Sequence, residues 1–240
     1  MSIIQWDKDK TVAVIKLANG ENRQNLDFAN SFNRVLDEII ADQSISAAVI
    51  TSTDPKFWSL GVDIDWLGQQ FQEQNLDNIK AFMNGMNTVF KRLLLFPLPV
   101  IAAISGHAFG NGAILSCACD FRFMRSDRGY FCFPEVDLGI PFLPGMIAFV
   151  RKAVPEYKFN ELKLTGKKAG AAELAENGVI MKACADADEL VHESMTFART
   201  FVKKRGIFGE HKKRMHKRII EIMDTEDKKF IEPLFLMVQD

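Results

Sequence analysis

One carboxylate in this sequence has surroundings that suit proton transfer. Glu135 lies within residues 133–141, where apolar and proline residues flank it. Burial among such residues disfavours the charged form and raises a carboxyl pKa. A carboxylate with a raised pKa is a usable general base near neutrality. Asp137 competes for the same role, and a helix start or a loop salt bridge is the structural alternative for Glu135.

Two glycine-bearing turns could supply backbone hydrogen-bond donors. Residues 52–63 follow the apolar run 47–51, and residues 105–112 follow the apolar run 100–104. Ligands of open α/β sheets bind beyond the carboxyl ends of strands, and amides at a helix start have no acceptor within the helix. The second turn lacks the Gly-Lys-Ser/Thr of a phosphate-binding loop. The two turns therefore predict an oxyanion hole built from backbone amides, with ordinary tight turns as the alternative.

The elements that must position these groups alternate between strands and helices up to Pro144. Apolar residues recur at helical spacing in residues 27–42 and 76–95, and a short helix is expected over 113–118. The predicted strands, opening with a hairpin, are residues 3–6, 11–17, 47–51, 100–104, 121–124 and 130–133. Later helices are predicted over residues 146–153, 169–177, 188–203 and 208–223. We therefore expect a β/α core over residues 1–143 and a helical region over residues 144–240.

Composition indicates a single large domain, with or without a small appendage. The chain has 240 residues, of which 48% are hydrophobic and 25% charged, with a formal net charge of −1. This excludes wholesale disorder, and the charge balance argues against a nucleic-acid partner. The apolar runs are too short to cross a membrane, and residues 1–10 contain no secretory signal. We expect a cytoplasmic protein.

Neither the cysteines nor the basic run near the C-terminus predicts a site of its own. The cysteines Cys117, Cys119, Cys132 and Cys184 have no zinc-binding spacing, so buried thiols and no metal are expected. Residues 203–218 hold eight basic residues and one acid. They could form a nucleic-acid patch or a localisation signal, but an apolar stripe on the same predicted helix favours a solvated basic face.

Taken together and in this order, three motifs identify a family. They are Phe57-Trp58-Ser59-Leu60-Gly61-Val62-Asp63, the run from Pro99 to Gly112 followed by Cys119-Asp120-Phe121-Arg122, and Pro134-Glu135-Val136-Asp137-Leu138-Gly139. Over residues 11–204 the chain resembles the enoyl-CoA hydratase/isomerase family of the crotonase superfamily. The resemblance implies an α/β crotonase-like spiral of β-β-α units with a helical C-terminal region, assembled as a homotrimer or as a hexamer of two trimers.

The same resemblance implies an acyl-CoA thioester as substrate, with coenzyme A as part of the substrate and no separate cofactor. The thioester oxygen would accept hydrogen bonds from the amides of Leu60 and Asn111. The adenine and pantetheine of CoA would lie along residues 59–64. One or two lysines of the basic run 203–218, on the same or a neighbouring subunit, could meet the CoA phosphates. The binding residues implied are Ser59, Leu60, Gly61, Asp63, Ile64, Gly110 and Asn111.

Three departures from the family pattern refine the expected reaction. Asn111 replaces the usual glycine at the second donor and would add a side chain near the thioester, although asparagine tolerates a left-handed backbone. Leu60 replaces alanine and narrows the first turn. Hydratases of the family carry a glutamate three residues after the second donor, where this chain has Ile114, whereas the second glutamate is retained as Glu135.

A single carboxylate suits the movement of one proton better than the addition of water. The pattern therefore resembles the Δ3,Δ2-enoyl-CoA isomerase branch, in which Glu135 would take a proton from C2 and return it to C4. Another crotonase-type reaction (hydration, decarboxylation or thioester hydrolysis) and an inactive acyl-CoA binding protein are the alternatives. Trp66, Phe71, Phe109 and Phe142 would line an acyl pocket or belong to the core. Asp63 is expected to cap a helix, and Asp120 to pair with Arg122.

Overall fold

The computed structural model describes residues 2–238, so Met1 and the last two residues of the predicted helical region, Gln239 and Asp240, lie outside it. Its centre is a six-stranded sheet in the order β1-β2-β4-β7-β9-β11. The strands are β1 (Ile4–Asp9), β2 (Val12–Leu17), β4 (Ala47–Ser52), β7 (Val100–Ile104), β9 (Phe121–Arg125) and β11 (Lys182–Cys184). β1 and β2 form the predicted antiparallel hairpin, and every other pair is parallel.

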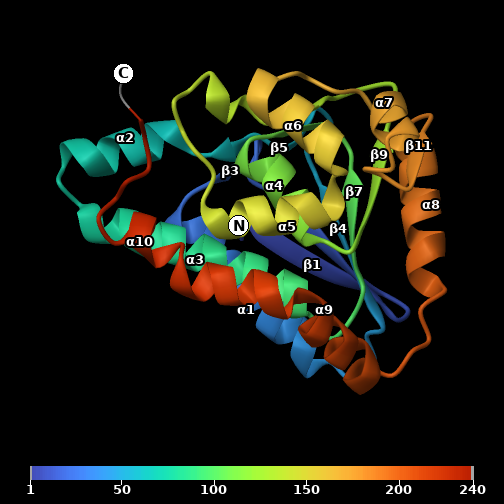
Figure 1. The fold of residues 1–240 in the computed structure, drawn as a ribbon. Coiled ribbons are helices and arrows are strands. Elements are labelled where there is room, and N and C mark those ends of the chain that lie inside the picture. Colours follow the sequence, from blue (N-terminus) through green and yellow to red (C-terminus); the bar gives the residue numbers. More distant parts are fainter. Residues whose placement is uncertain (1, 239–240) are drawn as a thin grey trace.

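Strands β2, β4, β7 and β9 each contribute to two hydrophobic cores, because successive side chains point to opposite faces. On one face Val49, Ile101 and Ala103 pack against α8 (Ala187–Arg199). On the other face Ile50, Ala102 and Ile104 belong to the larger core, which also holds the apolar faces of α1 (Leu26–Ala41) and α3 (Leu76–Leu95). Figure 1 shows α8 on one side of the sheet and α1 and α3 on the other. The helical spacing of residues 76–95 predicted α3 with its observed bounds.

Successive turns of the chain repeat one unit. A strand of the main sheet is followed by a strand of a smaller sheet and then by a helix. The smaller strands are β3 (Arg23–Gln24), β5 (Phe57–Ser59), β6 (Gly61–Val62), β8 (His107–Phe109) and β10 (Phe131–Cys132). The helices that follow β6 and β8 are α2 (Ile64–Gln72) and α4 (Asn111–Ala118), and β10 leads into the single 3₁₀ turn η1 (Pro134–Val136). This arrangement confirms the predicted spiral of β-β-α units.

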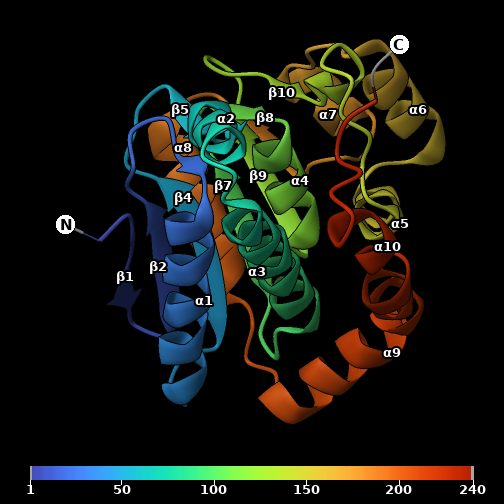
Figure 2. The same ribbon diagram turned by 90° about the vertical axis from the view of Figure 1, so that its left-hand side faces the viewer.

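The chain after Pro144 is mostly helical, as predicted. It contains α5 (Pro144–Ala153), α6 (Glu156–Thr165), α7 (Ala171–Glu176), α8, α9 (Arg205–Thr225) and α10 (Lys228–Ile231). The expectation that strands end before this region was wrong, because residues 182–184 return to the main sheet as β11 and pair with β9. Figure 2 shows α9, α10 and the C-terminal segment packed along one side of the spiral.

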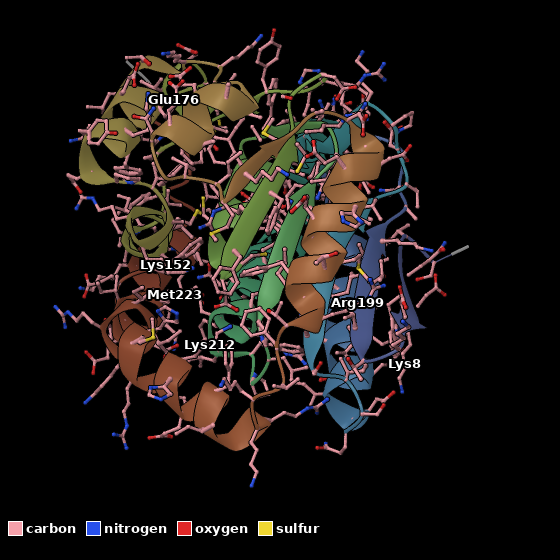
Figure 3. The ribbon with its side chains drawn as sticks, turned by 90° about the vertical axis from the view of Figure 1, so that its right-hand side faces the viewer. Lys8, Lys152, Glu176, Arg199, Lys212 and Met223 are labelled. Carbon is pink, nitrogen blue, oxygen red and sulfur yellow. The ribbon has the colours of Figure 1, made fainter. Side chains whose placement is uncertain are left out.

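The expected pair between Asp120 and Arg122 does not form. Asp120 instead accepts hydrogen bonds from Lys212 of α9 (2.7 Å) and from the Val100 amide (2.8 Å). Arg122 donates to backbone carbonyl groups, including that of Val179 at 2.8 Å. Lys212 is therefore buried and Arg205 is half-buried, whereas the other lysines and arginines of the basic run 203–218 are exposed. Figure 3 places Lys212 with Lys152 between the C-terminal helices and the sheet. None of the helices described for residues 2–238 is long and apolar enough to cross a membrane.

Candidate active site

An apolar cavity of about 540 Å³ lies at the end of the spiral where β6 and β8 lead into helices. Its walls come from α2, α3, the first turn of α4, residues 134–146 and residues 230–237. The apolar lining includes Leu67, Phe71, Phe82, Met83, Met86, Phe109, Phe142 and Met146. Trp66, which was predicted to line an acyl pocket with three of these aromatics, packs instead against Phe82 with the ring centroids 5.4 Å apart.

Glu135 is the sole acid among the described residues that line this cavity. It lies in η1 and is 7% exposed, and its Oε2 atom has no hydrogen-bond partner within residues 2–238. Burial raises the pKa of Glu135 to about 7, against smaller lowering effects of a backbone hydrogen bond and of Lys163. The Glu135 carboxyl group therefore titrates closer to neutral pH than an ordinary glutamate, which suits it both to accept and to release a proton.

Lys163 is the cation that acts on the Glu135 carboxylate. It projects from α6, which packs against η1, and its Nζ lies 4.0 Å from the centroid of the Phe142 ring. Phe142 lines the cavity and meets Phe133, two residues before Glu135, edge to face at 5.3 Å. The cation lowers the pKa of Glu135, and burial in turn lowers the pKa of Lys163.

Replacing Lys163 by methionine should move the acid limb of the pH–rate profile to higher pH. Burial raises the pKa of Glu135 and the Lys163 cation lowers it, so removal of the cation raises this pKa further. The deprotonated, base form of Glu135 then appears only at higher pH. The other charged groups close to this stretch, Lys168 and Asp137, are unchanged. The acid limb of kcat/KM reports this ionisation, and Lys163→Arg, which keeps the charge, should retain the native profile. An unchanged limb in Lys163→Met would contradict the assignment.

The first glycine turn is held tightly against the second. Gly61 has φ +81°, and a Cβ placed there would lie 2.7 Å from the Phe109 carbonyl oxygen and 2.8 Å from the Asn111 nitrogen. The Leu60 amide, predicted as the first oxyanion donor, donates to the Glu21 carbonyl at 3.0 Å. Leu60 lines the cavity, but the structure does not support its amide as a free donor.

Val62 offers the alternative donor on this strand. Successive amides of a parallel strand point alternately toward and away from the partner strand. The Asp63 amide donates across the β3–β6 pair to Gln24 at 2.9 Å, so the preceding amide of Val62 points away from β3. Val62 also lines the cavity. Its N–H is therefore the amide of this turn that is available to a bound ligand.

The second turn presents Asn111 as the first residue of α4. An amide in the first turn of a helix has no intrahelical acceptor, and the Asn111 nitrogen lies beside Gly61. The positive φ of this turn belongs to Gly110 (+54°), so Asn111 needs no left-handed backbone. Its side chain, expected beside the thioester, instead donates to Oε1 of the buried Gln24 at 2.6 Å. The two turns are thus tied by Gln24, whose Nε2 also donates to Ser59 Oγ at 3.2 Å.

The structure brings together some of the predicted binding residues and separates others. Leu60, Ile64, Gly110, Asn111 and Glu135 line the cavity. Ser59 is fully buried, with its hydroxyl donating to the Asn22 carbonyl at 2.7 Å, and Gly61 fits against the second turn. Asp63 caps α2 as predicted by accepting the Trp66 amide at 3.1 Å. Ser59, Gly61 and Asp63 therefore shape the turn rather than line the cavity.

Ile114 occupies the wall of the cavity one turn along α4 from Asn111. Its side chain is 2% exposed and offers no group that could bind water. Asp137, the competitor of Glu135, is exposed and does not line the cavity. The arrangement can polarise a carbonyl through two backbone amides and move a proton through one carboxylate.

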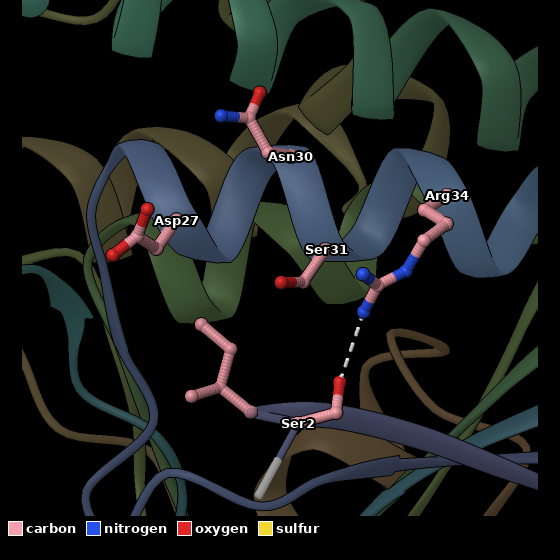
Figure 4. Close-up of a pocket in the computed structure, with 6 residues that line it drawn as sticks. Ser2, Asp27, Asn30, Ser31 and Arg34 are labelled. Atoms are coloured by element: carbon pink, nitrogen blue, oxygen red, sulfur yellow. Dashed lines mark hydrogen bonds between the residues drawn. The ribbon is translucent and has the colours of Figure 1, made fainter.

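Other candidate sites carry no comparable chemistry. A polar recess between the N-terminal segment and α1 is lined by Ser2, Ile3, Asp27, Asn30, Ser31 and Arg34, where Arg34 donates to Ser2 at 3.1 Å (Figure 4). Within residues 2–238 there is no cluster of three or more His, Cys, Asp and Glu side chains that could hold a metal ion. All four cysteines are buried and free.

Sequence reasoning missed Val62, Gln24, Lys163 and the contribution of residues 230–237. Nothing in the residue spacing of this turn distinguishes the amide of Val62 from that of Leu60, because the difference comes from the backbone conformation at Gly61. Gln24 stands in a polar loop and Lys163 in a charged helix, so nothing in their sequence neighbourhood separates them from surface residues.

Three comparisons relate this geometry to known proteins. The family model for enoyl-CoA hydratase/isomerase matches residues 7–230. The chain is 28% identical over 221 residues to the peroxisomal enoyl-CoA delta isomerase 2 of Arabidopsis thaliana, covering 90% of this chain and 92% of that protein. It is 28% identical over 190 residues to carnitinyl-CoA dehydratase of Escherichia coli, covering 79% and 70%. The crystal structure of human mitochondrial delta3-delta2-enoyl-CoA isomerase matches in fold, with a TM-score of 0.84 at 19% identity over 97% of this chain and 92% of that one.

Proposed function

The chain belongs to the enoyl-CoA hydratase/isomerase family and has the crotonase fold, and from this premise we propose that it moves the double bond of a 3-enoyl-CoA to position 2. Glu135 takes a proton from C2, and the electron pair of that C–H bond passes into a dienolate. The thioester oxygen of the dienolate accepts hydrogen bonds from the amides of Val62 and Asn111. Glu135 then returns the proton to C4, which gives the conjugated 2-enoyl-CoA.

This proposal rests on one observation: the buried carboxylate of Glu135 lines the same cavity as Val62 and Asn111, whose amides are available to a ligand. A thioester enolate develops negative charge on oxygen, and fixed backbone dipoles stabilise that charge without reorganisation. Hydration requires a second group to hold and activate water, and at the corresponding place the cavity has Ile114. The named Arabidopsis isomerase supports the same choice, whereas the dehydratase relative supports the acyl-CoA class alone.

The remaining features of the proposal follow from the acyl-CoA class. Coenzyme A is part of the substrate, and no separate cofactor or metal is required. We keep the prediction of a cytoplasmic homotrimer or hexamer, which sedimentation of the purified protein and localisation of a tagged chain would test. The apolar cavity suits the acyl chain, and Arg23 is the one basic residue that lines it within residues 2–238.

The proposal is tested by supplying 3-enoyl-CoA and 2-enoyl-CoA esters separately and resolving the products by chromatography. We expect conversion of the 3-enoyl ester to its conjugated isomer, without a 3-hydroxy product from either ester. A 3-hydroxyacyl product would identify a hydratase, and release of free CoA or carbon dioxide would identify a thioesterase or decarboxylase. Binding without turnover would identify an acyl-CoA binding protein. Each of these outcomes would overturn the isomerase assignment.

A further inference from the structure

One wall of the apolar cavity is made by residues 230–237, which we call the cap. Phe230, Phe235, Leu236 and Met237 of the cap line the cavity together with α2, α3 and residues 134–146. In Figure 1 this segment follows α10 and runs up to the C-terminal end, and Figure 2 shows it next to the loop after η1 and apart from α2. The cap therefore closes a site whose base and amide donors come from residues far earlier in the chain.

A buried carboxylate anchors the start of the cap. Asp227 is fully buried immediately before α10, and its two oxygens accept the Gly145 amide at 2.7 Å and the Asn87 side-chain amide at 2.9 Å. Gly145 is in the first turn of α5, where the helix dipole favours an anion. A Cβ on Gly145 would lie 2.6 Å from Asp227 Oδ2, so the carboxylate fits only because glycine stands there.

Just after the cap, a backbone hydrogen bond ties the chain to the loop that follows η1. The Val238 amide donates to the Gly139 carbonyl at 2.8 Å, just after η1. A Cβ on Gly139 would approach the Val238 carbonyl oxygen to 2.9 Å, so this contact is also close. The cap is thus fastened at both ends, to α3 and α5 at one and to the loop that follows Glu135 at the other.

The cap differs from the opposite wall in how firmly its side chains are packed. Phe82 and Met86 of α3 are 1% and 2% exposed and belong to the main core, so that wall is fixed. Phe235 and Met237 line the cavity and yet remain 67% and 56% exposed. The cap is therefore a thin wall between the cavity and solvent. A longer acyl chain would displace the side chains of this wall more easily than those of α3.

We propose that the cap sets the length of acyl chain that the site accepts, with Phe235 and Met237 as the residues that determine this specificity and Asp227 as the latch that holds them. The inference rests on the proposed acyl-CoA site. A chain that fits inside the cap buries its methylenes against apolar walls, whereas a longer chain must displace the cap or leave its end in water.

Binding calorimetry with saturated butanoyl-, octanoyl- and hexadecanoyl-CoA tests this without turnover, because these esters have no double bond to move. In the double variant Phe235→Ala with Met237→Ala, affinity for hexadecanoyl-CoA should rise relative to octanoyl-CoA by about fourfold for each methylene newly buried. Affinity for butanoyl-CoA should not change. Met215→Ala, at an exposed methionine of α9 outside the cavity, is the matched control and should keep the native length profile.

The latch is tested separately by Asp227→Asn and Asp227→Ala. Amides of residues 228–238 should exchange hydrogen faster in both variants, more so in the alanine variant, while α3 keeps its protection. An unchanged ratio of hexadecanoyl to octanoyl affinity in the double variant would overturn the cap proposal even if isomerisation is found. Native binding of acyl-CoA without isomerisation would overturn the proposed reaction and leave the length test valid. Failure to bind any of the three esters would overturn both.

Discussion

Replacing Glu135 by glutamine should lower kcat for isomerisation on the order of a thousandfold, because general acid–base catalysis by one positioned group contributes about that much. Glutamine has nearly the same shape but cannot accept the C2 proton. Since the amides of Val62 and Asn111 remain, KM should change little. The measurement is the steady-state rate of conversion of a 3-enoyl-CoA ester, monitored as formation of the conjugated product.

Asp137→Asn provides the matched control for this variant. Asp137 lies two residues further along, carries the same kind of charge and is exposed outside the cavity. Its substitution should leave kcat within a factor of about two, in line with the small effects of surface substitutions. Residual isomerisation by Glu135→Gln at a rate close to the native one would remove Glu135 from the mechanism.

The Glu135→Gln substitution should also stabilise the fold at alkaline pH. Burial raises the pKa of Glu135 from an ordinary 4.5 to about 7, so the folded state binds this proton more tightly than the unfolded chain. The resulting stability is fully present below pH 4.5 and is lost as pH rises through 7, and the difference is about 3 kcal/mol. The Glu135→Gln variant does not lose stability in this way, because glutamine does not ionise. Urea unfolding at pH 5 and pH 8 should show a stability advantage of Glu135→Gln that grows with pH, and equal curves at both would contradict the buried ionisation.

Replacing Gly61 by alanine should impair both stability and catalysis. Gly61 has φ +81°, and an added Cβ would come within 3 Å of the Phe109 carbonyl oxygen and the Asn111 nitrogen. Backbone strain and overpacking each cost about 1–3 kcal/mol. Relief of the clash moves β6 away from α4, which separates the amides of Val62 and Asn111. Loss of one such donor lowers kcat on the order of 10²-fold. Urea unfolding and kcat/KM measure the two effects.

The control variant Gly20→Ala distinguishes the backbone strain of a positive φ from the steric contact between the two turns. Gly20 has a similarly positive φ of +56°, but nothing lies within 4 Å of an added Cβ there. It should show the backbone cost alone, with kcat unaffected. If Gly61→Ala were no more harmful than Gly20→Ala, the close contact between the two turns would not be what positions the donors.

Local patterns in the sequence predicted most of the elements and the burial of the proposed base. The helical spacing of residues 76–95 and the proline after them defined α3, and glycines at 61, 110 and 112 marked both turns. Proline and apolar neighbours indicated the burial of Glu135, which the structure shows. In each case the residues that predict the structural feature lie within or next to it in the sequence, so the local sequence is sufficient for the prediction.

Features that depend on backbone direction or on distant segments could not be predicted in this way. Whether Leu60 or Val62 presents its amide depends on the conformation at Gly61, which residue spacing does not encode. Strand β11 has three residues and therefore no readable period, and it forms because β9 offers an open edge. Asp120 and Arg122 have suitable spacing for a pair, but Lys212, more than ninety positions later, takes the carboxylate.

The strand order of the main sheet has a consequence for how the protein is made. From β2 onward, each strand is added beside the strand that precedes it in the sheet, so none must insert between two strands already paired. Since chains fold from the N-terminus during synthesis, the sheet can grow in the order in which residues leave the ribosome. Its advancing edge is the five-residue strand β9 until the three-residue β11 pairs with it, and long open edges recruit foreign strands more readily than short ones. The nascent chain is therefore most prone to aggregation after β9 has formed and before residues 182–184 emerge.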